Sequence, residues 1–199
     1  MISSETLPTI SAQRVLLRSL RDDDRPALFE VFSDPETMRY WSSPPWTKES
    51  QASEYLEEIR TGLRTRSFFQ WGLARRSDDH VLGTCTLFAY HEPCRRAEVG
   101  FILGRRHWGQ GLMTEGFQAL LRHSFEELGL RRLEADTDPR NTGSIRLLER
   151  MGFQREGLMR ERWEVGGEIQ DSVLFGLLRR EWMAEQEPRG GSRKPPQGC

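Results

Sequence analysis

Residues 105–114 read Arg-Arg-His-Trp-Gly-Gln-Gly-Leu-Met-Thr and lie between a strand-like run and the start of an amphipathic helix. Gly109 and Gly111 carry no Cβ atom, so a diphosphate can approach the backbone N–H groups closely. The N-terminus of the following helix adds unpaired donors and a partial positive charge. Arg105 and Arg106 add charge at the rim. The segment predicts a diphosphate-binding loop, while a helix entry that only needs flexible glycines is the alternative.

Two other kinds of phosphate loop are disfavoured by the spacing. A P-loop has a lysine and a hydroxyl residue after its last glycine, where this chain has Leu112 and Met113. A dinucleotide fingerprint has a third small residue at the position of Thr114 and belongs to the first βαβ unit of its chain. The present loop lies in the middle of the chain, after several strand-like runs.

Strand-like and helical patterns alternate around this loop. After the glycines, apolar residues such as Met113 and Phe117 recur at helical spacing. We predict strands at residues 14–18, 68–74, 81–90, 96–103 and 130–137, a strand pair within 153–178 that turns at Gly166-Gly167, and further helices at residues 22–33, 48–66 and 142–151.

These elements indicate a single α/β domain. Helices that lie between strands around one sheet form an α/β sandwich. Because neighbouring strands are joined by short polar turns, we expect a central mixed sheet, mostly antiparallel, with helices on both faces. Residues 1–187 are predicted to form this domain. The Pro- and Gly-rich residues 188–199 are predicted to be a disordered tail.

Composition limits the classes of function. The 199 residues are 36% hydrophobic and 30% charged, as expected for a soluble globular protein. No apolar run reaches the roughly 20 residues of a membrane helix, and the N-terminus lacks the pattern of an export signal. A formal net charge of −1 argues against general nucleic-acid binding. We therefore expect no membrane and no direct nucleic-acid partner.

The cysteines indicate the compartment and argue against a metal. Cys85, Cys94 and Cys199 are an odd number and show no CxxC or Cys/His ligand spacing. This usage fits a reducing compartment without structural zinc. We expect a cytoplasmic protein that binds no metal ion.

A second block of interest follows about 30 residues after the loop. It runs from Asn141 to Phe153 and contains Ser144 and Gly152. Asn141 suits the N-cap of a helix, and Gly152 suits its left-handed end. Capping alone would explain Asn141, so the block gains its meaning from its pairing with the loop.

Together the two blocks resemble the GNAT superfamily of N-acetyltransferases. The Arg106-x-x-Gly109-x-Gly111 pattern resembles that family's coenzyme A pyrophosphate motif, and the block from Asn141 to Phe153 resembles its next conserved block. Further features resemble the RimJ/RimL branch, whose named members acetylate N-termini of ribosomal proteins. These are Trp108-Gly109-Gln110-Gly111, Glu156-Gly157, and Asp171-Ser172-Val173-Leu174-Phe175 before Arg180-Glu181-Trp182.

The resemblance covers roughly residues 14–182 and implies an acetyl-CoA-dependent enzyme. It implies that backbone N–H groups from Gly109 to Met113 hold the pyrophosphate, and that the strand end at 99–102 pairs with the pantetheine arm. Asn141 and Ser144 would lie beside the sulfur. The implied coenzyme-binding residues are Phe101, Ile102, Arg106, Gly109, Gln110, Gly111, Leu112, Met113, Asn141 and Ser144.

Glu98 is our candidate for the catalytic base. It is the carboxylate of the strand that leads into the loop, and apolar neighbours raise the pKa of a carboxyl group towards that of a working base. A pairing with a neighbouring arginine such as Arg95 is the alternative. Glu156 and Glu161 in the later strand are weaker candidates.

The acid that protonates the leaving sulfur is a point where this chain departs from the family. Many relatives use a tyrosine after the second block, where this chain has Phe153. Ser144 is our candidate in its place, with helix capping as its alternative role. A thiol with a pKa near 8.5 needs little assistance to leave. Cys85 is expected to pack in the core rather than to act as a nucleophile.

The acceptor is predicted to be a protein N-terminal α-amine that attacks the thioester directly in a ternary complex. Its pKa near 8 leaves about a tenth neutral at pH 7, whereas a lysine near 10.4 needs about 4 to 5 kcal/mol to lose its proton. A small-molecule amine and a non-catalytic acyl-CoA-binding module are the alternatives. Exposed strands after Gly152 would suit a homodimer. The residues expected to border the acceptor are Tyr40, Trp41, Trp46, Phe68, Trp71 and the acidic residues around Glu49. The alternative is that these aromatic residues pack a loop onto the core.

Overall fold

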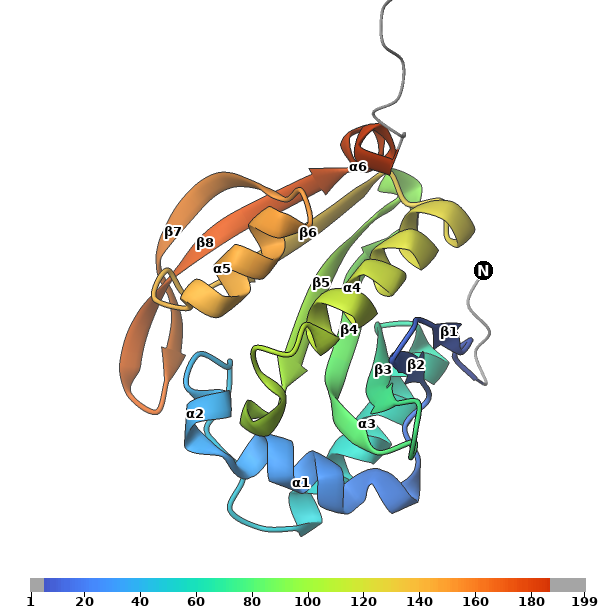
Figure 1. The fold of residues 1–199 in the computed structure, drawn as a ribbon. Helices are drawn as coiled ribbons and strands as arrows, with labels where there is room; N and C mark the ends of the chain where they lie inside the picture. The colour runs from blue at the N-terminus through green and yellow to red at the C-terminus, as the bar shows by residue number, and fades with distance from the viewer. Residues whose placement is uncertain (1–5, 187–199) are drawn as a thin grey trace, which may run out of the picture.

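The computed structural model describes residues 6–186 (Figure 1). The tail predicted at 188–199 lies outside this range, so the domain limits stay predictions. Eight strands form one sheet in the order β1-β2-β3-β4-β5-β6-β8-β7. The strands are β1 (Ile10–Ser11), β2 (Val15–Arg18), β3 (Phe68–Arg75), β4 (Val81–His91), β5 (Arg96–Leu103), β6 (Arg132–Thr137), β7 (Gln154–Val165) and β8 (Glu168–Leu178).

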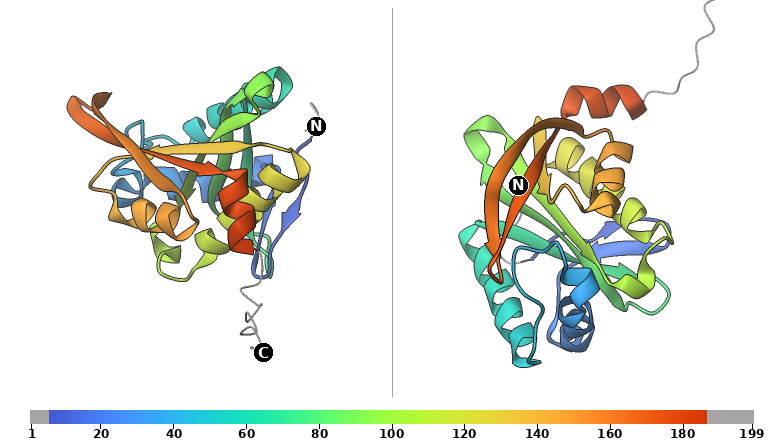
Figure 2. Two further views of the ribbon diagram at one scale, coloured as in Figure 1. Left: turned by 90° about the horizontal axis from the view of Figure 1, so that it is seen from above. Right: turned by 90° about the vertical axis from the view of Figure 1, so that its left-hand side faces the viewer.

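Helices cover both faces of the sheet (Figures 1 and 2). The helices α1 (Arg25–Ser33), α2 (Pro35–Met38) and α3 (Ser50–Thr65) belong to one face, where α1 and α3 pack with Ala74, Val81 and Ile102 of the sheet. The other face carries α4 (Leu112–Arg122), α5 (Thr142–Arg150) and α6 (Arg179–Gln186). The predicted α/β fold with a mixed, mostly antiparallel sheet is confirmed.

Successive side chains of each strand point to opposite faces of the sheet and so pack against different helices. In β3 and β4, Trp71 pairs with Cys85 and Phe69 with Leu87, and all four side chains are buried in the core beneath α4. The residues between them face α1 and α3 instead. The same alternation in β5 separates Ala97 and Val99, which enter the α4 core, from Glu98 on the opposite face.

The pair β5–β6 is the parallel one, because α4 carries the chain back across the sheet before β6 begins. The two strands pair only where Arg96–Glu98 lies beside Arg132–Glu134. Beyond these residues they are not paired, although β5 continues to Leu103 and β6 to Thr137. The two strands meet near α6 and diverge towards their other ends (Figure 1). The sheet is therefore split at its centre.

The hairpin of β7 and β8 extends away from the body of the molecule as a curved arm (Figures 1 and 2). It turns at Gly166 and Gly167, both with positive φ, as the sequence predicts. The pairing shifts register between Met159 and Trp163, where Glu161 has a φ of 52°. This irregularity bends the arm over the split in the sheet.

The sequence misses several short elements. The single turn α2 forms because Pro35 starts it and the Asp34 carboxylate accepts a hydrogen bond from the N–H of Thr37 at 2.7 Å. The last helix, α6, is anchored by buried Trp182, which packs on Phe125. Both helices are too short to show a clear helical period, and α6 depends in addition on this tertiary contact.

Candidate active site

A pocket of about 640 Å³ occupies the split between β5 and β6. Its walls include Val99 to Phe101 from β5 and Ala135 to Thr137 from β6. On one side it reaches α5 and the core beneath α4. On the other it reaches β3, β4, the loop after α2 and the β7–β8 hairpin. The missing strand pairs thus create a passage through the sheet from one helical layer to the other.

Beyond Glu98, β5 has no strand partner on the side that faces the split. Its outward-pointing backbone groups therefore border the pocket and can pair with an extended ligand. Phe101 lines the pocket, whereas the side chain of Ile102 is buried against α1. Of these two predicted coenzyme residues, Ile102 can contribute only its backbone.

The glycine loop lies between the end of β5 and the start of α4. Gly109 and Gly111 have φ values of +72° and +74°, a conformation that favours glycine. A Cβ atom on Gly109 would have no neighbour within 4 Å, so open space lies in front of this backbone. Within residues 6–186 no hydrogen bond uses the N–H groups from Gly109 to Met113. The loop thus presents free donors at a helix N-terminus, which is what a diphosphate requires.

Side chains around the loop stabilise its shape. Arg14 donates a hydrogen bond from Nη1 to the carbonyl of Gln110 at 3.1 Å and forms an ion pair with Glu115 of α4 at 2.9 Å. The Gln110 side chain donates to the carbonyl of Arg106 at 3.0 Å. Arg106 itself is exposed and pairs with Glu30 of α1 at 2.9 Å.

Two further predicted coenzyme residues follow in α4. The side chains of Leu112 and Met113 are 7% and 6% exposed and belong to the core beneath the helix. They can therefore contribute only their backbone N–H groups to a ligand at the loop.

Asn141 and Ser144 lie at the N-terminus of α5 and both line the pocket. The Asn141 side chain accepts a hydrogen bond from the N–H of Ser144 at 3.1 Å, so it caps the helix as its alternative role requires. The Ser144 hydroxyl makes no hydrogen bond within the described part of the chain. It is free to interact with a ligand in the pocket.

Glu98 lines the pocket from the face opposite α4 and is half-buried. Burial raises the pKa of its carboxyl group, and the nearby charges of Asp136 and Glu134 raise it further, while Arg96 and Arg162 act in the opposite sense. Within residues 6–186 it forms no ion pair, and the alternative pairing with Arg95 is absent. The group can accept a proton at a higher pH than an ordinary glutamate.

Aromatic and polar side chains form the wall beside Glu98. Tyr40 and Trp41, from the loop after α2, line the pocket together with Phe68 and Phe88. Gln70 donates a hydrogen bond to the hydroxyl of Tyr55 on α3, and both also line the pocket.

Three residues that the sequence places near the acceptor lie elsewhere. Trp46 stacks on Phe32 of α1 with ring centroids 4.7 Å apart. Trp71 is fully buried in the core beneath α4, and its indole donates to the carbonyl of Pro8 at 3.0 Å. Glu49 is exposed and is not part of the pocket wall.

The weaker base candidates also lie away from the pocket wall. Glu156 is paired with Arg132 on β6, which lowers the pKa of its carboxyl group. Glu161 is exposed at the bend of β7, where its backbone N–H donates to Asp171 at 2.8 Å. Glu98 is thus the glutamate of these three that lines the pocket.

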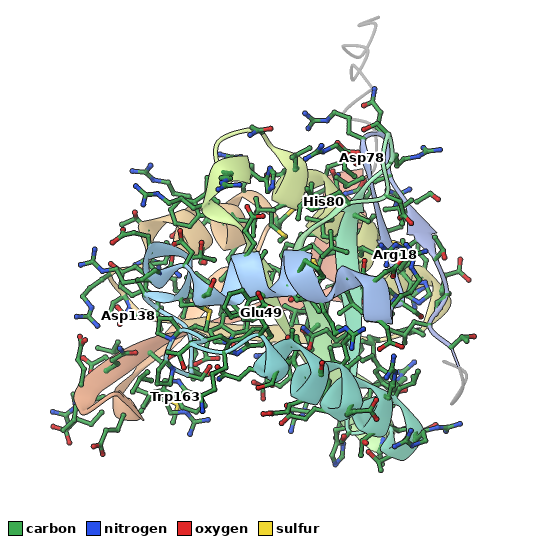
Figure 3. All side chains as sticks on the ribbon, turned by 90° about the horizontal axis from the view of Figure 1, so that it is seen from below. Arg18, Glu49, Asp78, His80, Asp138 and Trp163 are labelled. Carbon is green, nitrogen blue, oxygen red and sulfur yellow. The ribbon has the colours of Figure 1, made fainter. Side chains whose placement is uncertain are left out.

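Sequence reasoning missed Asp136 and the groups that the β7–β8 hairpin contributes to the pocket. Asp136 of β6 lines the pocket, as do Arg162, Trp163 and Ser172 from β7 and β8. Asp138 and Trp163 lie at the hairpin side of the molecule, opposite Arg18 on the far edge (Figure 3). A signal for Asp136 existed: buried Leu133, Ala135 and Thr137 alternate with polar residues, so Glu134 and Asp136 must share the other face.

Cys85 is buried, as the sequence predicts. Its side chain is 0% exposed and lies 3.6 Å from the sulfur of Met113. Burial raises the pKa of its thiol to about 12. A thiolate, the form that attacks carbonyls, is therefore strongly disfavoured.

Neither a metal site nor a membrane helix is found in the described range. Residues 6–186 contain no group of three or more metal-ligating side chains. No helix in this range has the length and apolarity to cross a membrane.

Comparison with known proteins places the chain in a family. A family model described as an acetyltransferase (GNAT) domain matches residues 14–154. The uncharacterised N-acetyltransferase p20 of Bacillus licheniformis is 35% identical over 88% of this chain and 99% of its own length. The structure of a GNAT-family acetyltransferase from Bacillus anthracis shares the fold, with a TM-score of 0.78 and 24% identity, over 87% of this chain and 100% of that one. The chain belongs to the GNAT acetyltransferase family.

Two other relatives differ in their acceptors. YdaF of Bacillus subtilis, named as a candidate ribosomal N-acetyltransferase, is 33% identical over 87% of this chain and 96% of its own. The spermidine N(1)-acetyltransferase of Escherichia coli is 23% identical over 90% and 94%. This chain is an acetyl-CoA-dependent N-acetyltransferase, and its fold is one that binds coenzyme A.

Proposed function

We propose that the enzyme transfers acetyl from acetyl-CoA to the α-amine of a protein N-terminus, as the RimJ/RimL branch does, in a ternary complex. The observation that carries this proposal is the continuous pocket through the split sheet. It joins Ser144 on one side to Glu98 on the other, so the two substrates can meet without a covalent enzyme intermediate. The relation to YdaF supports this acceptor class.

The coenzyme side of the proposal rests on backbone groups. The free N–H groups from Gly109 to Met113 would hold the pyrophosphate, with Arg106 at the rim. The unpaired edge of β5, including Phe101 and Ile102, would bind the pantetheine arm by strand addition. This arrangement would bring the thioester beside Asn141 and Ser144. Positioning of this kind supplies much of the barrier reduction in acyl transfer.

The side chains then move protons. Glu98 takes a proton from the acceptor ammonium, and the resulting amine attacks the thioester carbon. The new C–N bond forms as the C–S bond breaks, and the Ser144 hydroxyl donates its hydrogen bond to the departing sulfur. The second amine proton leaves to solvent. An α-amine suits this arrangement because its pKa near 8 lies close to the working pH.

A second candidate acceptor is a small polycationic amine. The acidic side chains Glu98, Asp136 and Asp171 line the pocket, and a spermidine acetyltransferase is among the relatives. Such an acceptor would use the same coenzyme site and the same base. A non-catalytic acyl-CoA-binding module would bind the coenzyme but release no thiol.

Thiol release from acetyl-CoA tests these candidates in parallel. The acceptors are short peptides with a free N-terminal serine or alanine, the same peptides N-terminally acetylated with an internal lysine, and spermidine. We expect turnover with the free N-termini, at least about tenfold faster than with lysine because of the difference in amine pKa. Faster turnover of spermidine would replace the acceptor assignment. Coenzyme binding without turnover of any amine would contradict the enzymatic proposal.

A further inference from the structure

Asp136 stands across the split from Glu98. The last pair of the β5–β6 ladder joins Glu98 to Glu134, and Asp136 follows two residues later on the same face of β6. Both Glu98 and Asp136 line the pocket. The two carboxylates therefore face the same space, one on each diverging strand.

The β7–β8 hairpin holds Asp136 by one oxygen. The hydroxyl of Ser172 on β8 donates to Oδ2 at 2.5 Å, and the indole N–H of Trp163 on β7 donates to the same atom at 3.1 Å. Ser172 is fully buried, whereas Trp163 is 41% exposed. Among the described residues Oδ1 has no hydrogen bond. One oxygen is thus fixed and the other is available to the pocket.

The carboxylates around Glu98 and Asp136 differ in how far arginines balance their charges. Glu134 is paired with Arg96 at 2.9 Å and with Arg132 at 2.7 Å, so its charge is largely balanced. Glu98 and Asp136 form no ion pair within residues 6–186, although Arg162 of β7 also lines the pocket. Asp171 of β8 lines the pocket too, with Oδ1 turned to the N–H of Glu161. Neighbouring carboxylates oppose each other's ionisation.

We propose that Asp136 is a positioning residue for Glu98, held by Ser172 and Trp163 at the open side of the split so that both carboxylates face the acceptor's ammonium group. The inference rests on the proposed role of Glu98 as base. Asp136 attracts the ammonium, and its fixed negative charge makes Glu98 the more avid proton acceptor. The ammonium proton passes to Glu98, and the neutral amine is released towards the thioester.

In this proposal the exposed β7–β8 hairpin contributes to the reaction. Trp163 on β7 and Ser172 on β8 connect the hairpin to the active site, each through one hydrogen bond to Asp136. The orientation of the arm over the split then sets where the Asp136 charge lies. No other element of residues 6–186 donates a hydrogen bond to this carboxylate.

The test follows the ionisation of Glu98 directly. Protein labelled with ¹³C at the glutamate carboxyl is titrated by NMR with and without CoA, and the Glu98 signal is assigned by its loss in Glu98→Gln. In Asp136→Asn, where the amide oxygen can still accept from Ser172 and Trp163, we expect the Glu98 midpoint to move to lower pH. The acidic limb of kcat/KM, measured with a peptide bearing an N-terminal serine and with spermidine, should move in the same direction, with kcat/KM about tenfold lower at pH 7.

Two further variants separate position from charge. Trp163→Phe and Ser172→Ala keep the Asp136 charge but each remove one donor. We expect a fall of several-fold in kcat/KM for the amine, with the Glu98 midpoint close to that of the wild type and the KM for acetyl-CoA unchanged. These variants also keep the test informative if Asp136→Asn does not fold. Glu164→Gln, on the exposed side of β7, is the control of equal charge change.

The outcomes distinguish this inference from the proposed function. An unshifted Glu98 midpoint in Asp136→Asn, or an equal shift in Glu164→Gln, would overturn the role of Asp136. Wild-type rates in both donor variants would also overturn it. Full activity in Glu98→Gln would instead overturn the proposed base, while the NMR titration would still report whether the two carboxylates are coupled.

Discussion

The glycine loop, which we propose holds the coenzyme, and the acceptor wall, the pocket wall around Glu98 that we propose receives the acceptor, are built in different ways. The loop presents the free backbone N–H groups from Gly109 to Met113, made accessible by two glycines within three residues. The acceptor wall presents side chains such as Glu98, Asp136 and Trp163, which come from separate strands. The first depends on chain conformation, the second on where several elements are placed in space.

This difference predicts different responses to substitution. A backbone-built site tolerates changes of side chain but not of φ and ψ. A site built of side chains depends on a few polar atoms, and each can be removed without moving the backbone. Variants on the two sides should therefore separate coenzyme binding from amine turnover.

The largest effect is expected for Glu98→Gln, which acts on the acceptor wall alone. We expect kcat/KM for the amine to fall by about 10²- to 10³-fold at pH 7, within the range of general bases. The Kd for CoA, measured by calorimetry, should not change. Because burial and the charges of Asp136 and Glu134 raise the pKa of Glu98, the wild-type rate should be lost at a higher pH than an ordinary glutamate would give. This acidic limb should be absent in the variant.

The unfolding temperature of Glu98→Gln provides a second test of the role of Glu98. The pKa of Glu98 is higher in the folded state than in the unfolded chain. Its ionised form therefore lowers the stability of the fold at pH values above the pKa that Glu98 has in the unfolded chain. Removing that charge should leave the unfolding temperature at pH 8 unchanged or slightly higher. A lower unfolding temperature together with lost CoA binding would mean that Glu98 serves the fold.

Gly109→Val acts on the loop alone. A β-branched residue disfavours a φ of +72°, and its side chain would enter the open space in front of the N–H groups. We expect the Kd for CoA to rise by about a hundredfold, or about 2.7 kcal/mol. Gly129→Val is the matched control, since Gly129 has a φ of +66° and equally open surroundings but lies outside the loop, in the segment before β6. Equal CoA affinity in the two variants would exclude the loop as the diphosphate site.

Ser144→Ala lies between the two regions. We expect kcat to fall by about tenfold to a hundredfold, because the departing sulfur loses a donor. The Asn141 cap should persist, since it uses the backbone N–H of residue 144. Thr142→Ala, an exposed change in the same helical turn outside the pocket wall, is the control. Unchanged turnover would remove Ser144 from the mechanism.

The smallest effect is expected for Cys85→Ser. The thiol is buried with its pKa raised to about 12, so it plays no part in a ternary-complex reaction. We expect kcat/KM to stay within about twofold of the wild type, with any loss appearing as stability. Initial-rate patterns of the ping-pong type, with enzyme acetylated by acetyl-CoA alone, would contradict this and would favour a covalent route.

The candidate site was only partly predictable from the sequence. Glu98 could be identified because one carboxylate interrupts an apolar strand, and Asn141 because helix caps have local signatures. Trp71 was misplaced because alternation within β3 turns it towards the α4 core, and a sequence does not say which face of a strand borders a cleft. The site role of Asp136 was missed for the same reason.

The sequence by itself determined the order of the longer strands and helices along the chain, the glycine loop and the cap of α5, because each depends on residues only a few positions apart. The tertiary structure decided how far β5 and β6 pair before they diverge, and hence the pocket. It also brought Trp163 and Ser172 onto Asp136, across 27 and 36 residues of chain. Such contacts depend on strand register and on the bend of the hairpin, which are fixed only when all the layers pack together.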